Sequence, residues 1–99
     1  MTRPASSDVV ATLDLIGGHL ANWRKLYGLK LEDVAQRAGI TRQTVARIEA
    51  GDPGVRFEHV LRVCRSVGIL QKLENAMDPF ETEIGRNRAE TFLKERVRR

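Results

Sequence analysis

The feature that most constrains the fold is a glycine between two short segments of helical period. Apolar residues recur at steps of three and four on both sides of it: Leu31, Val34, Ala35, Ala38, Val45 and Ile48. Gly39 ends the first segment, because glycine takes the left-handed conformation without a Cβ clash. Thr41 then offers an N-cap hydroxyl for a second helix over residues 42–50. The pattern predicts two short helices joined by a tight turn.

This arrangement is the helix-turn-helix geometry, in which the second helix enters the major groove of DNA. Counted from Leu31, the fifth residue is small, the ninth is glycine, and the tenth, fifteenth and eighteenth are branched: Ala35, Gly39, Ile40, Val45 and Ile48. The small residue lets the helices approach, and the branched residues fix the angle between them. The segment predicts a DNA-reading unit, and a helical hairpin without a DNA role is the alternative.

Further helices are predicted on both sides of this pair. Before it, the apolar stripe ends ahead of Gly28 and comprises Leu13, Ile16, Leu20, Trp23 and Leu26. The pair Gly17-Gly18 weakens this helix, because a glycine in a helix interior costs about 1 kcal/mol relative to alanine. We therefore expect regular helix only from about Leu15, with residues 1–14 as an arm or a separate short helix. After the pair, helices are predicted over residues 57–67 and 70–77, the first with an inner face of Phe57, Val60, Leu61, Cys64 and Val67.

Positive charge is concentrated in two zones of the chain. Residues 85–99 carry six basic and two acidic groups, and they supply the whole net charge of +4, since residues 1–84 balance 11 basic against 11 acidic groups. Residues 19–65 form a second basic zone, with nine basic and five acidic groups. This layout suits a polyanion but does not choose among DNA, RNA and an acidic protein surface. Scattered apolar residues predict that the basic segment 79–99 is partly disordered, so the domain proper is expected over residues 15–78.

Composition argues against several functions. No apolar run approaches the roughly 20 residues that cross a bilayer, and residues 1–7 lack a secretory signal, so we expect a cytoplasmic protein without a membrane partner. His19 and His59 have no second ligand pair near them, and Cys64 is the single cysteine, placed on an apolar stripe. We therefore expect no metal and no cofactor. No nucleophile, base and orienting residue come together, which predicts a protein that is not an enzyme.

Three stretches of the chain carry a family resemblance: Ile16-Gly-Gly-His-Leu-Ala-Asn-Trp-Arg24, Gly28-Leu29, and the run from Glu32 to Gly51. They resemble the Xre/Cro/C1 helix-turn-helix family, and the resemblance covers about Ile16 to Leu70. It implies an all-α fold: a five-helix Xre/lambda-repressor-like domain followed by a flexible basic tail. Shorter pieces are similar to HipB-like antitoxins, whose genes accompany HipA-like kinase toxins. These pieces are Gly51-Asp-Pro-Gly-Val55, Gly68-Ile-Leu-Gln-Lys-Leu73 and Leu93-Lys-Glu-Arg-Val-Arg-Arg99.

The outer face of the second motif helix is the predicted DNA-reading surface. Because Val45 and Ile48 point inward, Gln43, Ala46 and Arg47 fall on the opposite face, and Arg42 projects from the first turn. Arginine suits guanine and glutamine suits adenine, while a small residue such as Ala46 permits close approach. The predicted DNA-binding set is Lys30, Thr41, Arg42, Gln43, Thr44, Ala46, Arg47 and Arg56. Ordinary solvated polar residues are the alternative interpretation.

The resemblance implies further roles. The family often contacts a phosphate through a glutamine where this chain has Leu31, and Lys30 is the candidate replacement. An ion pair between Arg24 and Glu49 is expected to hold two helices together without touching DNA. One helix covers too few base pairs for useful specificity, so a homodimer on a palindrome with half-sites roughly 34 Å apart is expected. The candidate dimer surface comprises Ile69, Leu70, Leu73 and Met77.

Three functional hypotheses follow. The first is a bacterial repressor that binds double-stranded DNA at its own promoter, associates with the nucleoid when bound, and acts as antitoxin to a HipA-like kinase. The second is a stand-alone or phage-type repressor. The third is a protein-interaction module that acts through its basic tail without reading DNA. The tail itself is open to three interpretations: a solvated end, added phosphate affinity, or a docking segment.

Overall fold

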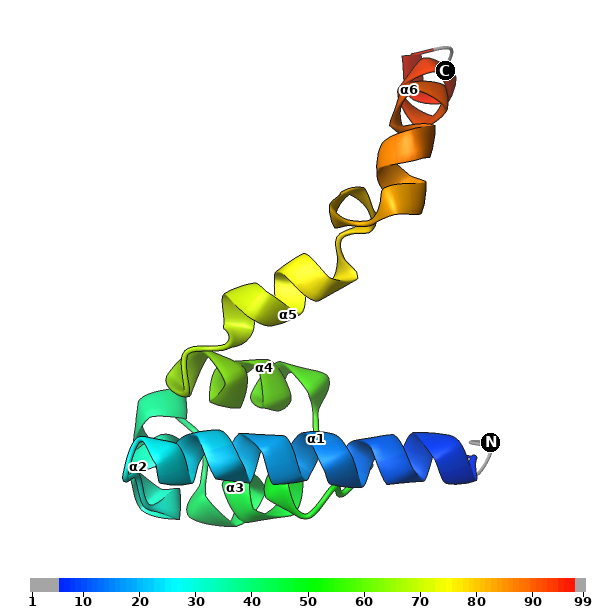
Figure 1. The fold of residues 1–99 in the computed structure, drawn as a ribbon. Coiled ribbons are helices and arrows are strands. Elements are labelled where there is room, and N and C mark those ends of the chain that lie inside the picture. The colour runs from blue at the N-terminus through cyan, green and yellow to red at the C-terminus, as the bar shows by residue number, and fades with distance from the viewer. Residues whose placement is uncertain (1–5, 98–99) are drawn as a thin grey trace. The chain divides into compact units, whose positions relative to one another are not determined.

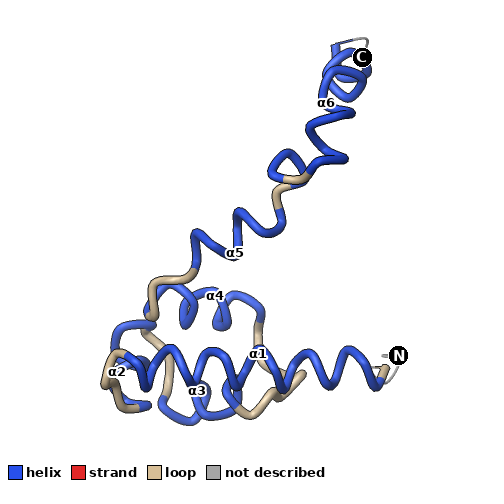
Figure 2. Tube along the Cα trace, in the orientation of Figure 1, coloured by secondary structure: helices blue, strands red, loops and turns tan. Residues whose placement is uncertain are grey.

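The computed structural model describes residues 6–97, in which helices are joined by loops and turns and no strand occurs (Figures 1 and 2). The predicted all-α fold is therefore confirmed. None of the described helices is long and apolar enough to cross a membrane. The chain divides into two compact units, of which the first ends at Ile69 and the second begins at Leu70.

The first unit holds four helices. They are α1 (Ser7–Leu26), α2 (Leu31–Ala38), α3 (Arg42–Glu49) and α4 (Phe57–Ser66). Helix α2 packs against both α3 and α4, and α1 packs against α3. Their shared core comprises Leu20, Val34, Ala35, Ala38, Val45, Ile48, Val63, Cys64 and Val67.

Helix α1 is longer than the sequence predicts. It runs without a break from Ser7 through Gly17 and Gly18, so the predicted arm or separate short helix at its start is wrong for the described residues; residues 1–5 lie outside them. The reason is tertiary packing: Gly17 is buried, and a Cβ there would lie 2.5 Å from the backbone oxygen of Glu49. The close approach of α1 to the end of α3 offsets the intrinsic cost of the glycines.

The motif itself forms as predicted. Gly39 ends α2 with φ of 69°, in the left-handed region. The Thr41 hydroxyl caps α3 by accepting a hydrogen bond from the Thr44 backbone N–H at 3.1 Å. Helix α4 differs in one respect: Phe57 is 64% exposed, whereas Val63 is buried. The inner face of α4 therefore includes Val63 in place of Phe57, while Cys64 and Val67 are buried as predicted.

The second unit contains α5 (Leu70–Met77), a 3₁₀ turn (Pro79–Glu81) and α6 (Glu83–Val97). Here the structure differs from the predicted partial disorder, since α6 is a sixth helix. The Asp78 carboxylate accepts a hydrogen bond from the Phe80 N–H at 2.9 Å, and the Thr82 hydroxyl accepts one from the Gly85 N–H at 3.1 Å. The rings of Phe80 and Phe92 then lie 5.5 Å apart. Local capping and this aromatic contact order a segment whose apolar residues look scattered in sequence.

Candidate nucleic-acid interface

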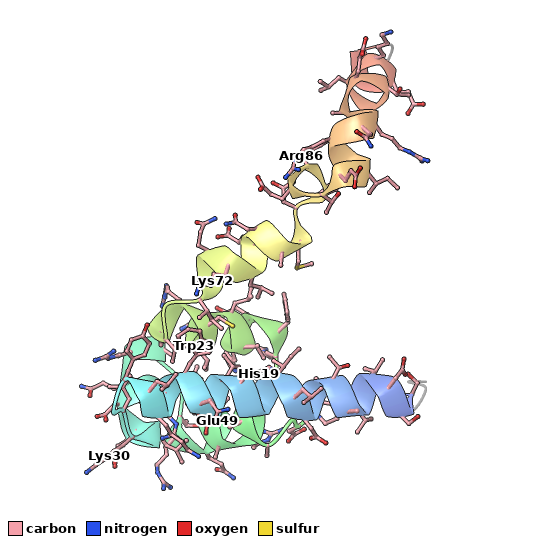
Figure 3. The ribbon with its side chains drawn as sticks, viewed as in Figure 1. His19, Trp23, Lys30, Glu49, Lys72 and Arg86 are labelled. Atoms are coloured by element: carbon pink, nitrogen blue, oxygen red, sulfur yellow. The ribbon has the colours of Figure 1, made fainter. Side chains whose placement is uncertain are left out.

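An ion pair fixes the inner side of α3. Arg24 on α1 donates from Nε to Glu49 Oε2 at 2.8 Å and from Nη2 to Oε1 at 3.0 Å, and its Nη1 donates to the Leu29 carbonyl at 2.9 Å. The two side chains are only 13% and 11% exposed, and Figure 3 shows Glu49 beside α1. The hydrogen bond to Glu49 raises the pKa of Arg24 above its usual value. Arg24 thus ties α1, the loop before α2 and the end of α3 together, which is the arrangement that the resemblance implied.

The first turn of α3 presents donors to solvent. Arg42 and Gln43 are exposed, and neither side chain forms a hydrogen bond or an ion pair with any described residue. Thr41 and Thr44 behave differently, because their hydroxyls hydrogen bond to each other at 2.8 Å while Thr41 caps the helix. Ala46 is half-buried. Arg42 and Gln43 are therefore the residues of this face most available to a ligand.

Arg47 has a partner that the sequence analysis missed. Its Nε donates to Asp52 Oδ2 at 2.7 Å, and the other carboxylate oxygen, Oδ1, accepts the Gly54 backbone N–H at 2.7 Å. The hydrogen bond from Arg47 lowers the pKa of Asp52, and the Gly54 N–H adds to this effect. The signal in the sequence was the Asp-Pro-Gly turn, which places a carboxylate five residues after Arg47.

The two other predicted cations lie immediately before helices. Lys30 is the N-cap of α2, where its backbone N–H donates to Asp33 Oδ2 at 2.7 Å while its side chain points away from the helices (Figure 3). Arg56 is the N-cap of α4 and is exposed. The positive end of a helix dipole and a cation side by side favour phosphate. Neither residue belongs to α3, so any contact they make to DNA is separate from the α3 face.

Comparison with known proteins agrees with this geometry. A family model described as a helix-turn-helix domain matches residues 15–77. The chain belongs to the helix-turn-helix domain family. Searches of curated proteins and of solved structures returned no match. Helix-turn-helix domains bind DNA through their second motif helix, which in this domain is α3.

The predicted dimer residues are divided between the two units. Ile69 ends the first unit, and Leu70, Leu73 and Met77 belong to α5 in the second. Met77 is 71% exposed, and the other three are half-buried. The dimer surface therefore stays a prediction.

The cysteine and the two histidines are the other side chains whose reactivity the sequence raises. Cys64 is buried, and burial raises the pKa of its thiol, so its predicted place in the core is confirmed. His19 is exposed and His59 is half-buried. Within residues 6–97, no group of three or more His, Cys, Asp or Glu is placed to hold a metal ion.

Proposed function

We propose that this helix-turn-helix domain is a sequence-specific transcriptional repressor that reads double-stranded DNA with the outer face of α3. One observation carries the proposal: Arg42 and Gln43 are exposed, without partners among the described residues, on a helix whose other side is anchored by the Arg24–Glu49 pair. Arginine can pair with guanine O6 and N7, and glutamine with adenine N6 and N7. A fixed helix with free donors is what direct readout of base edges requires.

Contacts outside α3 would position the domain on the backbone. Lys30 and Arg56 suit phosphates, because both are cations at helix N-termini. A homodimer on a palindrome, with half-sites roughly 34 Å apart, would double the number of base pairs read. Ile69, Leu70, Leu73 and Met77 remain the candidate dimer surface. The proposed operator lies in the promoter of the protein's own gene, which makes the repressor autoregulating.

The test begins with selection of duplexes from a random-sequence pool by the full chain. The affinity for the selected duplex is then compared with that for a scrambled duplex over a range of salt concentrations, because phosphate contacts make both affinities fall with salt. We expect a ratio of about 10³ or more. It should collapse in the triple variant Arg42→Ala, Gln43→Ala, Arg47→Ala. A control variant, Arg65→Ala with Arg88→Ala, also removes two exposed cations and should keep the ratio.

A wild-type chain that shows no preference at any salt concentration would overturn the proposal. Autoregulation is tested separately, by asking whether the selected motif occurs upstream of the protein's own gene. Repression of a reporter carrying that upstream DNA should then depend on Arg42.

We further infer that the repressor is a HipB-like antitoxin of a HipA-like kinase. Besides the resemblance of its short segments, the second unit supports a protein partner, because Ile84 and Leu93 are 61% and 57% exposed. Leu93 also lines a cavity of about 370 Å³, together with Phe80, Arg86 and Ala89. The full chain should co-purify a kinase encoded by a neighbouring gene, and Leu93→Glu should abolish this. A genome without a kinase-like neighbour would instead favour the stand-alone repressor.

A further inference from the structure

The contact between Arg47 and Asp52 restricts how Arg47 can meet a base. An arginine can present a pair of donors in two ways, either Nε with one terminal nitrogen or the two terminal nitrogens together. In this domain Nε is already bonded to Asp52 Oδ2 at 2.7 Å. Neither terminal nitrogen of Arg47 has a hydrogen bond to another described residue. Only the end-on pair, Nη1 and Nη2, is left for a ligand.

The loop after α3 is built to hold the Asp52 carboxylate. Oδ1 accepts a hydrogen bond from the Gly54 backbone N–H at 2.7 Å. The backbone therefore fixes the position of the carboxylate that contacts the guanidinium. Gly54 also leaves space around the contact between Asp52 and Arg47, because it has no side chain. A Cβ at that position would lie 3.2 Å from Asp52 Oδ1 and 3.5 Å from Arg47 Nη2. The side chain of Arg47 is 48% exposed, so it is accessible to a ligand although its Nε is held.

We propose that Asp52 is a positioning residue, which holds the guanidinium of Arg47 so that its two terminal nitrogens meet the O6 and N7 atoms of one guanine. This role of Asp52 rests on the proposed function, since it concerns how the α3 face distinguishes one base pair from another. Arginine is rich in rotamers, and a side chain that is already ordered loses less entropy when it binds. The negative charge of Asp52 also offsets the attraction of Arg47 to phosphates. That attraction is the same for every DNA sequence. Asp52 thus raises the preference for the correct base pair over other DNA.

A second ion pair in the same unit provides a matched control. On α4, Arg62 donates from Nε to Glu58 Oε2 at 2.8 Å, and its Nη2 lies 2.7 Å from the same oxygen. The hydrogen bond from this arginine likewise lowers the pKa of Glu58. Arg62, however, also donates from Nη1 to the Ala38 carbonyl at 3.2 Å, so it holds α4 to the end of α2. Removal of the Glu58 charge therefore breaks the exposed Arg62–Glu58 pair on α4 and leaves the residues of the α3 face unchanged.

The deciding variant is Asp52→Asn. Its carbonyl can still accept the Gly54 N–H, whereas its amide nitrogen cannot accept a hydrogen bond from Arg47 Nε, so the turn is kept and the positioning contact is lost. We expect the affinity ratio between the selected and scrambled duplexes to fall about two- to tenfold. The loss should be confined to one base pair when the site is scanned. Glu58→Gln should leave the ratio unchanged.

A double-mutant cycle separates positioning from a merely structural role. In an Arg47→Ala background, Asp52→Asn should cause no further fall in the ratio, because the side chain that it positions is gone. A wild type that discriminates, with an Asp52→Asn variant that keeps the full ratio, would overturn the positioning role and leave the proposed repressor intact. An equal fall in both backgrounds would also overturn it. A wild type without any preference would instead refute the proposed function itself.

Discussion

The two sides of α3 carry arginine–carboxylate pairs of the same chemistry in opposite settings. On the inner side, Arg24 and Glu49 share two hydrogen bonds and are 13% and 11% exposed. On the outer side, Arg47 and Asp52 share one hydrogen bond and are 48% and 33% exposed. An exposed pair adds little to stability, whereas the loss of one partner from a largely buried pair leaves a poorly solvated charge. The inner pair therefore sets where α3 lies, and the outer pair sets how one side chain on it is presented.

The largest expected effect comes from breaking the inner pair. Glu49→Ala leaves the Arg24 guanidinium with only the Leu29 carbonyl as an acceptor. We expect the free energy of unfolding to fall by about 2–3 kcal/mol. This is toward the lower end of the loss for breaking a fully buried ion pair, because Arg24 and Glu49 keep some exposure to solvent. Urea denaturation of the full chain measures this. Asp52→Ala is the comparison and should cost much less; equal losses from the two variants would show that the pairs do not differ in role.

The outer face should show the reverse pattern, with an effect on DNA and none on stability. Arg42→Ala should weaken binding to the selected duplex by about 1–3 kcal/mol and relax specificity at one base pair. Its unfolding midpoint should stay at the wild-type value, because Arg42 has no hydrogen bond or ion pair within the described chain. Titration against single base-pair variants of the duplex measures the effect. Equal weakening on selected and scrambled DNA would mean that Arg42 contacts a phosphate and not a base.

The elements that could be predicted from sequence are those determined by local chemistry. The bounds of α2 and α5, the left-handed glycine after α2 and the Thr41 cap follow from periodicity, φ preference and a hydroxyl in the right place. The long α1 could not be predicted this way, because it depends on how closely α1 approaches α3 at Gly17. On α4 the periodic pattern correctly placed Cys64 and Val67 in the core, but it included the exposed Phe57 and left out the buried Val63. The helix α6 was missed because Phe80 and Phe92, whose contact orders it, lie far apart in sequence.

The candidate site shows the same division. The residues of the α3 outer face could be chosen from helix geometry alone, because two inward residues determine the opposite face. The Asp-Pro-Gly turn was the only sign of Asp52 in the sequence, and it did not identify the contact with Arg47, which depends on the path of the loop after α3. A carboxylate there also looks unfavourable for a DNA-binding surface when only its charge is counted. Its value to Arg47 becomes apparent only when the positions of both carboxylate oxygens are known.

Adjacent glycines on α1 test how sharply the inner contact is defined. Gly17 faces α3 at the point where a Cβ would lie 2.5 Å from the Glu49 carbonyl oxygen and 2.6 Å from that of Ile48. Gly17→Ala should lower the free energy of unfolding by about 1–2 kcal/mol, because the cost of overpacking exceeds the gain in helix propensity. Urea denaturation measures this change. An unchanged or higher stability would mean that α1 can move away from α3 at no cost.

Gly18→Ala gives the smallest expected effect and the opposite sign. A Cβ at Gly18 meets no atom within 4 Å, and the backbone there is helical, so alanine brings its helix propensity without a clash. The free energy of unfolding should rise by about 0.5–1 kcal/mol, measured by the same denaturation experiment. DNA affinity should not change, since the contact between α1 and α3 is untouched. A destabilised Gly18→Ala would show that the glycine pair is needed for flexibility in α1, in which case the loss in Gly17→Ala could not be assigned to the approach of α3.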